Sequence, residues 1–159
     1  MNFVLMSADI RPARITDLDA LSSIENAVFE TDRLSRRSFR RLLKSGTVSL
    51  IVATRQDAPA GYALVLYRKG GRTARLYSLA VAPAYRSFGY GRMLLDAAED
   101  AASARGCRAL RLEVREDNAR AIGLYEHAGY RRRDRVPDYY QDGAAALRFE
   151  KSLGEQSDT

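Results

Sequence analysis

The sequence predicts one α/β domain in which helices cover a mixed β-sheet. The chain has 159 residues, of which 46% are apolar, and this length supports a single hydrophobic core. Its expected elements follow the order β-α-α-β-β-β-α-β-α-β-β, which is typical of a mixed sheet flanked by helices. We therefore expect one domain over residues 8–151, with flexible ends at 1–7 and 154–159.

Each predicted strand is a short run of β-branched, aromatic or aliphatic residues bounded by turn residues. The predicted strands cover residues 9–14, 47–54, 60–67, 73–81, 109–114, 130–136 and 144–151, and the predicted helices begin at Thr16, after Ser35, at Gly89 and at Ala119. The turn sequence Gln56-Asp57-Ala58-Pro59 would join the second and third strands into a hairpin.

The helix boundaries are predicted from capping residues. Thr16, followed three residues later by Asp19, has the pattern of a capping box at a helix start. Asn118 is a favourable N-cap for the last helix. Gly106 and Gly129 would end the third and fourth helices, because glycine readily adopts the left-handed conformation found there.

The formal net charge of +6 is concentrated in two segments. One is a basic face of the predicted second helix, and the other is the arginine-rich segment 131–135 on the sixth strand. Neither segment is a basic patch with interleaved aromatic residues, and no nucleic-acid-binding module is recognisable. We interpret both as solvated faces and expect no specific nucleic-acid partner.

Composition also limits the cellular setting and the metal chemistry. The apolar runs are too short for a membrane span or a signal segment, so we expect a cytoplasmic monomer or weak homodimer that does not bind membranes. Cys107 has no second cysteine with which to form a disulfide, and Cys107 and His127 alone do not make a metal site. We expect no metal, and we place Cys107 in the core.

A basic, glycine-containing turn joins the fourth strand to the third helix. The segment Arg86-Ser87-Phe88-Gly89-Tyr90-Gly91 precedes a helix whose first N–H groups have no intrahelical partner. Such a helix start binds anions, so the turn predicts a pyrophosphate site and a phosphate-bearing cofactor. Leu94 stands where a dinucleotide-binding fingerprint needs its third glycine, and no Gly-Lys-Ser/Thr sequence completes a P-loop.

The same six residues match the Arg/Gln-x-x-Gly-x-Gly/Ala signature of the GNAT acetyltransferases, at the position that the family requires. Downstream, residues 110–130 resemble the RimI-like branch, which acetylates the amino terminus of a ribosomal protein. The resemblance covers residues 9–151. It implies the GNAT acyl-CoA N-acyltransferase fold, a mixed, mostly antiparallel seven-stranded sheet flanked by four helices, and an enzyme that uses acetyl-CoA.

The resemblance also implies roles for individual residues. Glu113 matches the general base of the family, and Tyr125 matches the general acid, which would protonate the departing CoA sulfur. A backbone N–H within residues 79–81 would bind the acetyl oxygen. The residues implied in CoA binding are Leu79, Ala80, Val81, Arg86, Ser87, Phe88, Gly89, Tyr90, Gly91, Arg92, Asn118 and Tyr125.

Each of these chemical roles has a structural alternative. Glu113 alternates with Leu112 and Val114 along its strand, so it could simply face solvent. Tyr125 could be a half-buried packing residue of an amphipathic helix. Asn118 could act as a helix cap alone.

The predicted acceptor is a primary amine, and the cost of deprotonating it ranks the candidates. At neutral pH this cost is about 1 kcal/mol for an α-amine and about 4.5 kcal/mol for a lysine, from reference pKa values of about 7.8 and 10.4. A single glutamate base therefore favours the N-terminal α-amine of a protein, with direct transfer in a ternary complex. A lysine or small-molecule amine acetyltransferase and a non-catalytic acyl-CoA-binding module are the alternatives.

Departures from the RimI-like pattern lie in two loops. Segment 29–34 lacks the proline and tryptophan of that branch, and segment 138–147 is shorter and lacks an acidic residue before the last strand. Carboxylates and phenols in this region could meet a cationic amine. The residues expected to contact the acceptor are Glu30, Asp32, Tyr77, Tyr139 and Tyr140.

Overall fold

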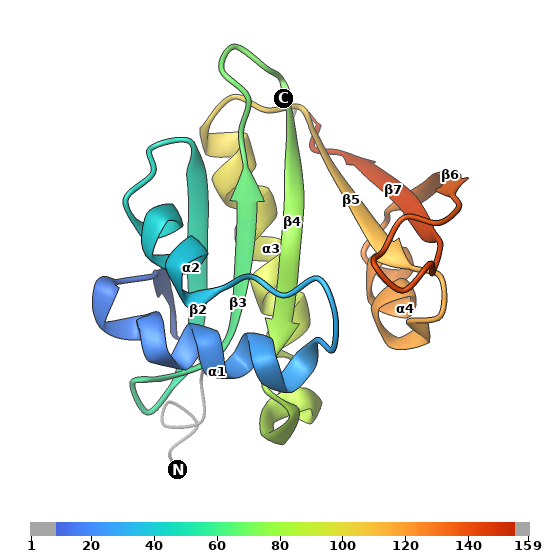
Figure 1. Cartoon of the computed structure of the whole chain (residues 1–159). Helices are drawn as coiled ribbons and strands as arrows, with labels where there is room; N and C mark the ends of the chain where they lie inside the picture. The colour runs from blue at the N-terminus through green and yellow to red at the C-terminus, as the bar shows by residue number, and fades with distance from the viewer. Residues whose placement is uncertain (1–8, 155–159) are drawn as a thin grey trace.

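The computed structural model describes residues 9–154, which are built on one seven-stranded sheet (Figure 1). The strand order is β1-β2-β3-β4-β5-β7-β6, and only β4 and β5 pair in parallel. The strands are β1 (Asp9–Pro12), β2 (Val48–Arg55), β3 (Ala58–Leu66), β4 (Thr73–Val81), β5 (Ala109–Arg115), β6 (Arg131–Val136) and β7 (Ala146–Ser152). The α-helices of this described part are α1 (Leu18–Val28), α2 (Arg36–Leu43), α3 (Tyr90–Ala104) and α4 (Ala119–His127), and short 3-10 turns occur at η2 (Ile15–Asp17) and η3 (Pro83–Phe88). The predicted mixed, mostly antiparallel sheet flanked by four helices is confirmed.

The helices cover the two faces of the sheet unequally. Helices α1 and α2 pack on one face, over β2, β3 and β4, whereas α3 and α4 pack on the opposite face (Figure 1). A hydrophobic core lies on each face of the sheet, and successive residues of β3 point into the two cores in turn. Leu64 packs under α1 and α2, and Val65 packs under α3. Cys107 is buried in the core under α3, as predicted.

The sheet opens between β4 and β5. These strands pair from Thr73 with Ala109 to Leu76 with Leu112, and beyond that point they diverge (Figure 1). A β-bulge on β4 accompanies the opening, because Tyr77 is an extra residue between two consecutive pairs with β3. Within the described chain, the second half of β4 therefore has no strand partner on its β5 side, and its backbone groups there are available to a ligand.

The start of α1 differs from the prediction. The predicted capping box of Thr16 and Asp19 is wrong, because η2 delays the helix and makes Asp17 its N-cap residue. The Arg14 N–H donates to Asp17 Oδ2 at 2.7 Å, and Arg11 binds both carboxylate oxygens of Asp17 at 2.8 and 2.9 Å. The hydrogen bond from Arg11 is the main cause that lowers the pKa of the Asp17 carboxyl, despite its burial.

The other element boundaries are close to those predicted. Strand β4 spans the predicted residues, and Ser35 and Asn118 cap α2 and α4 by accepting backbone N–H groups at 3.0 and 3.1 Å. The hairpin turn is tighter than predicted, because Gln56 and Asp57 both adopt positive φ and β3 already begins at Ala58.

The arginines of α2 and β6 are exposed, apart from their contacts with neighbouring carboxylates. No helix within residues 9–154 is long and apolar enough to cross a membrane. The predicted flexible ends, 1–7 and 154–159, fall almost entirely outside the described residues.

Candidate active site

Glu113 stands at the opening of the sheet. It follows the last β4–β5 pair on β5, and its side chain is 16% exposed. Its Oε1 accepts a hydrogen bond from Arg75 Nε at 2.9 Å, and its Oε2 lies 3.8 Å from Arg148 Nε. The carboxylate is therefore enclosed between two guanidinium groups from β4 and β7, and is not freely solvated.

Tyr125, on α4, lies in an aromatic cluster on the other side of the sheet. It is 7% exposed, and its ring centroid is 5.8 Å from that of Tyr130 and 6.5 Å from that of Phe149. Burial raises the pKa of the Tyr125 phenol, and the neighbouring Tyr140 raises it further, so the phenol is protonated at neutral pH. A protonated phenol is the form that a general acid requires, and the same burial fits the packing interpretation.

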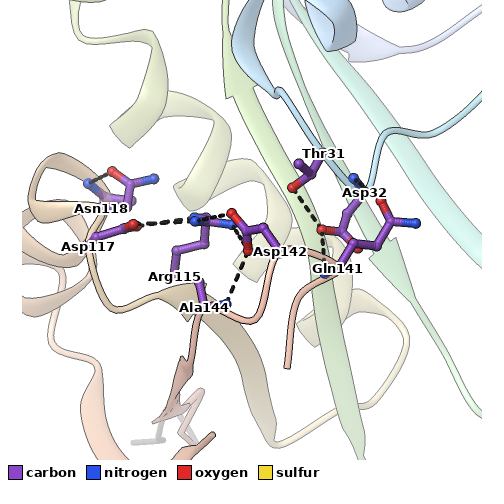
Figure 2. Close-up of polar contacts among 9 residues, drawn as sticks. Thr31, Asp32, Arg115, Asp117, Asn118, Gln141, Asp142 and Ala144 are labelled. Carbon is purple, nitrogen blue, oxygen red and sulfur yellow. Dashed lines mark hydrogen bonds and ion pairs between the residues drawn. The ribbon is translucent and has the colours of Figure 1, made fainter. Parts of the chain in front are cut away.

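Arg115 organises the loop between β6 and β7, residues 137–145. Its Nη atoms bind the two carboxylate oxygens of Asp142 at 3.1 and 2.8 Å, and its Nε lies 3.1 Å from Asp117 (Figure 2). Asp142 also accepts the N–H of Ala144 at 3.1 Å, which closes the turn. The hydrogen bond from Arg115 lowers the pKa of the Asp142 carboxyl. Arg115 also fixes the position of Tyr140, because its guanidinium lies over the Tyr140 ring, 5.2 Å from the ring centroid.

A hydrogen-bonded bridge joins this loop to the α1–α2 loop. The Asp32 N–H donates to Gln141 Oε1, and the Gln141 N–H donates to Asp32 Oδ2, both at 3.3 Å (Figure 2). Thr31 Oγ1 donates to the same Asp32 oxygen at 2.9 Å (Figure 2). Two segments 109 positions apart in sequence are thus held together beside the opening of the sheet.

The structure brings most of the predicted acceptor residues together. Tyr139 and Tyr140 pack edge to face at 4.9 Å, and Arg75 Nη2 donates to the Tyr139 phenol at 2.9 Å. Tyr77 is 43% exposed, and its ring lies 5.2 Å from the same guanidinium. Glu30 is exposed, and no hydrogen bond or ion pair joins it to the rest of the described chain.

The predicted anion site lies at the start of α3. The segment before it, predicted as a basic, glycine-containing turn, includes the 3-10 turn η3, and Gly89 adopts a left-handed φ of 81° where η3 meets α3. A Cβ atom at Gly91 would lie 3.5 Å from Leu124 of α4 and 4.0 Å from Val81 of β4. The helix start, the end of β4 and α4 therefore converge on one place. Arg86 is exposed beside it, so the donors and the charge fit a phosphate group.

A buried carboxylate on α1, Glu25, was not predicted from the sequence. Glu25 of α1 is 2% exposed and accepts the N–H of Leu34 at 2.7 Å and the phenol of Tyr62. The Tyr62 phenol also contacts Ser78 Oγ at 2.8 Å, on the half of β4 that no longer pairs with β5. Glu25 occupies a position that looks like an ordinary polar residue of an amphipathic helix, and only the tertiary structure shows its partners.

The free energy of unfolding should depend on the ionisation of Glu25. Burial is the main cause that raises its pKa, so the group stabilises the fold below its unfolded pKa of about 4.3 and loses that contribution as pH rises through the folded value. The non-ionisable Glu25→Gln should therefore become more stable relative to the unmodified protein as pH rises above about 4.3.

Urea unfolding at several pH values measures the difference in free energy of unfolding between the variant and the unmodified protein. The loss of one acceptor oxygen adds a constant to this difference, so the pH dependence alone reports the ionisation of Glu25. Glu126→Gln, at an exposed position on α4, is the matched control and should show no such trend. A pH-independent difference for Glu25→Gln would contradict the prediction.

Sequence and structure comparisons assign the chain to a family. Residues 16–130 match the sequence model of the Acetyltransferase (GNAT) family, and the chain therefore belongs to this family. GNAT enzymes use acetyl-CoA, as in the structure of yncA from Salmonella typhimurium with its cofactor.

Several known proteins are similar to the chain. It is 34% identical over 134 residues to an uncharacterised protein of Mycobacterium leprae, covering 81% of this chain and 36% of the relative. It is 43% identical over 67 residues to the ribosomal protein bS18-alanine N-acetyltransferase of Escherichia coli, covering 42% of this chain and 45% of that enzyme. The matched segments thus span less than half of the length of these two curated relatives.

The structural comparison extends over the whole described domain. The crystal structure of the Escherichia coli ribosomal-protein-S18-alanine N-acetyltransferase has a TM-score of 0.83 and 28% identity, covering 96% of this chain and 97% of that one. Ard1 from Thermoplasma volcanium has a TM-score of 0.85 at 24% identity, which shows a common fold. The predicted resemblance to RimI-like GNAT acetyltransferases is thereby confirmed.

Proposed function

We propose that this protein transfers the acetyl group of acetyl-CoA to the N-terminal α-amine of a polypeptide, by direct transfer within a ternary complex. The opening between β4 and β5 carries this proposal, because Glu113 borders it, the start of α3 lies at the end of β4, and two loops meet beside it. A thioester and an amine that reach this opening from its two sides would meet near Glu113.

The donor side suits CoA in both shape and charge. The backbone of residues 87–92 offers the N–H groups of a helix start to the pyrophosphate, with Arg86 and Arg92 as nearby cations. The unpaired edge of residues 79–81 offers main-chain groups to the pantetheine arm and the acetyl oxygen. Asn118 already caps α4 through its side-chain oxygen, and contact with CoA is an additional role that we propose for it.

The chain supplies a proton acceptor and a proton donor. Bound acetyl-CoA would supply an acetyl group activated as a thioester. Glu113, held in position by Arg75, accepts the proton of the incoming amine directly or through water. Tyr125, whose phenol stays protonated, donates a proton to the departing sulfur. The amine thereby loses its positive charge, and the sulfur leaves as a neutral thiol and not as a thiolate.

Two observations support an α-amine as the acceptor. Deprotonating it costs about 3.5 kcal/mol less than deprotonating lysine at the same pH, so one glutamate is a sufficient base. The similar enzymes of Escherichia coli and Salmonella typhimurium are named for acetylating the alanine of a ribosomal protein. Asp32, Tyr77, Tyr139 and Tyr140 would surround the amine, with Glu30 as a more distant carboxylate.

Labelled acetyl-CoA and three acceptor classes test the proposal. Peptides with a free α-amine and no lysine, N-blocked peptides with one lysine, and small amines such as polyamines and aminoglycosides are compared by mass spectrometry. We expect label on the free α-amine peptides, with kcat/KM at least about tenfold above the other two classes. Label confined to lysine or to small amines would refute the proposed acceptor. Acetyl-CoA binding with no transfer to any class would indicate a binding module.

A further inference from the structure

A groove lined by six arginines lies on the face of the sheet that carries α1 and α2. It has a volume of about 670 Å³ and runs from the β3–β4 loop across β4, β5, β7 and β6. We call it the arginine groove, and its arginines are Arg68, Arg72, Arg75, Arg111, Arg133 and Arg148. Helix α1 packs over β3 and β4 and α2 packs over β2, so no helix of the described chain covers the groove (Figure 1).

The positive charge of the arginine groove is only partly compensated. Glu113 is the acidic residue among those that line it, and Glu150 and Asp134 form ion pairs with its arginines from outside. Six guanidinium groups therefore face three carboxylates. Arg68 and Arg72 are exposed and have no ion-pair partner among residues 9–154.

Inside the groove, the positive charge of Arg148 is also incompletely compensated by carboxylates. Its Nε is buried and has no hydrogen-bond partner within the described structure. The carboxylate of Glu113 lies 3.8 Å from this Nε, and that of Asp134 lies 3.8 Å from Nη1. A donor in this situation is stabilised by an additional anion. The groove thus lacks negative charge at its centre as well as at its rim.

The arginine groove is continuous with the proposed acceptor site. Glu113 and Tyr139, which we place beside the reacting amine, also line the groove. A polypeptide whose terminus is held there can continue into the groove without leaving the protein surface. Its side chains, not its terminus, would then meet the arginines.

We propose that the arginine groove binds acidic side chains of the acceptor polypeptide, downstream of the acetylated terminus. This inference rests on the proposed function and adds a specificity: the substrate is a polypeptide with aspartate or glutamate among its early residues. A peptide fits better than a nucleic acid, because the groove opens onto the site that we propose for the amine, and a peptide terminus supplies that amine.

A matched peptide series tests this specificity. All peptides have the same first residue and length, and each carries a pair of glutamates, glutamines or lysines at positions 2–3, 4–5 or 6–7. We expect kcat/KM for the best glutamate peptide to exceed that of its lysine counterpart by about tenfold at low salt, mainly through KM. The preference should fall as salt rises, because exposed charges are screened.

Charge reversal locates the effect. The double variant Arg68→Glu with Arg72→Glu changes two exposed residues that we place outside the catalytic machinery, and it should abolish or invert the preference while leaving kcat on the glutamine peptides unchanged. The control, Arg37→Glu with Arg40→Glu, changes the net charge equally on exposed positions of α2 and should keep the preference.

The possible results separate the two proposals. Acetylated α-amines with equal rates for the glutamate and lysine peptides would overturn the inference and leave the proposed function intact. Failure to acetylate any peptide terminus would overturn both. Tight binding of single-stranded RNA to the groove, lost in the double variant and without any peptide preference, would replace the acidic peptide with a nucleic acid.

Discussion

Replacing Glu113 with glutamine should lower kcat for peptide acetylation by about 100-fold at pH 7, while the Kd for acetyl-CoA changes by less than about twofold. Glutamine keeps an oxygen that can accept the Arg75 hydrogen bond, now 2.9 Å, so the local structure should persist. It cannot accept the proton of the amine. Steady-state kinetics together with direct titration of acetyl-CoA measure the two effects separately.

The pH profile of Glu113→Gln distinguishes a proton acceptor from a structural residue. The neutral fraction of an α-amine of pKa about 7.8 rises about sevenfold between pH 7 and pH 9, so the deficit of the variant should narrow by up to about that factor. Glu150→Gln is the matched control, because Glu150 lies on β7 and also pairs with arginines, namely Arg111 and Arg133. Turnover of Glu113→Gln equal to that of the control would exclude Glu113 as the base.

Replacing Tyr125 with phenylalanine should also lower kcat by about 100-fold, with little change in stability. The phenyl ring keeps the contacts with Tyr130 and Phe149, and no hydrogen bond to the Tyr125 phenol occurs among residues 9–154. The variant therefore removes the proton donor and almost nothing else. Single-turnover kinetics and thermal unfolding of the same preparation measure the two quantities.

Tyr130→Phe is the control for this change. Tyr130 belongs to the same aromatic cluster, but its phenol donates to Glu99 at 2.8 Å. Glu99 also binds Lys151, so the Tyr130 phenol is engaged in a separate polar contact. It should lose some stability and keep its kcat. If the two variants lose activity equally, the aromatic packing and not the Tyr125 hydroxyl would be the cause.

Local sequence signals predicted the parts of the fold that local physics determines. Asn118 caps α4 as expected, because a capping side chain needs only the next turn of its own helix. The predicted cap at Thr16 failed, since Arg11, on the neighbouring strand β1, holds Asp17 and shifts the helix start. A four-residue pattern contains no information on that contact.

The sequence predicts individual residues of the candidate site but not the contacts that hold them together. Glu113 and Tyr125 were identified through the family resemblance, and their proposed roles remain predictions. The pairing of Arg75 with Glu113 and the bridge from Asp32 to Gln141 join segments 38 and 109 positions apart. Such contacts follow from strand register and loop closure, which a single sequence does not specify.

The arginine groove shows the same limitation more clearly. Its arginines are spread over the β3–β4 loop and strands β4, β5, β6 and β7, so no cluster of all six is visible along the chain. Of the two basic groups visible in the sequence, only segment 131–135 contributes to the groove, and the sequence alone favours a solvated face for it. The sheet order places one of its arginines, Arg133, in the groove.

The position of β7 between β5 and β6 bears on how the protein is made. Strand β5, which carries Glu113, has β4 as a neighbour over four pairs only, and its other neighbour is β7, close to the carboxyl end. During synthesis, residues up to α4 leave the ribosome before the strand that completes this wall of the site. A nascent chain can therefore contain both Glu113 and Tyr125 and still lack the wall of the proposed acceptor site, so that the proposed transfer becomes possible only once β7 has paired with β5.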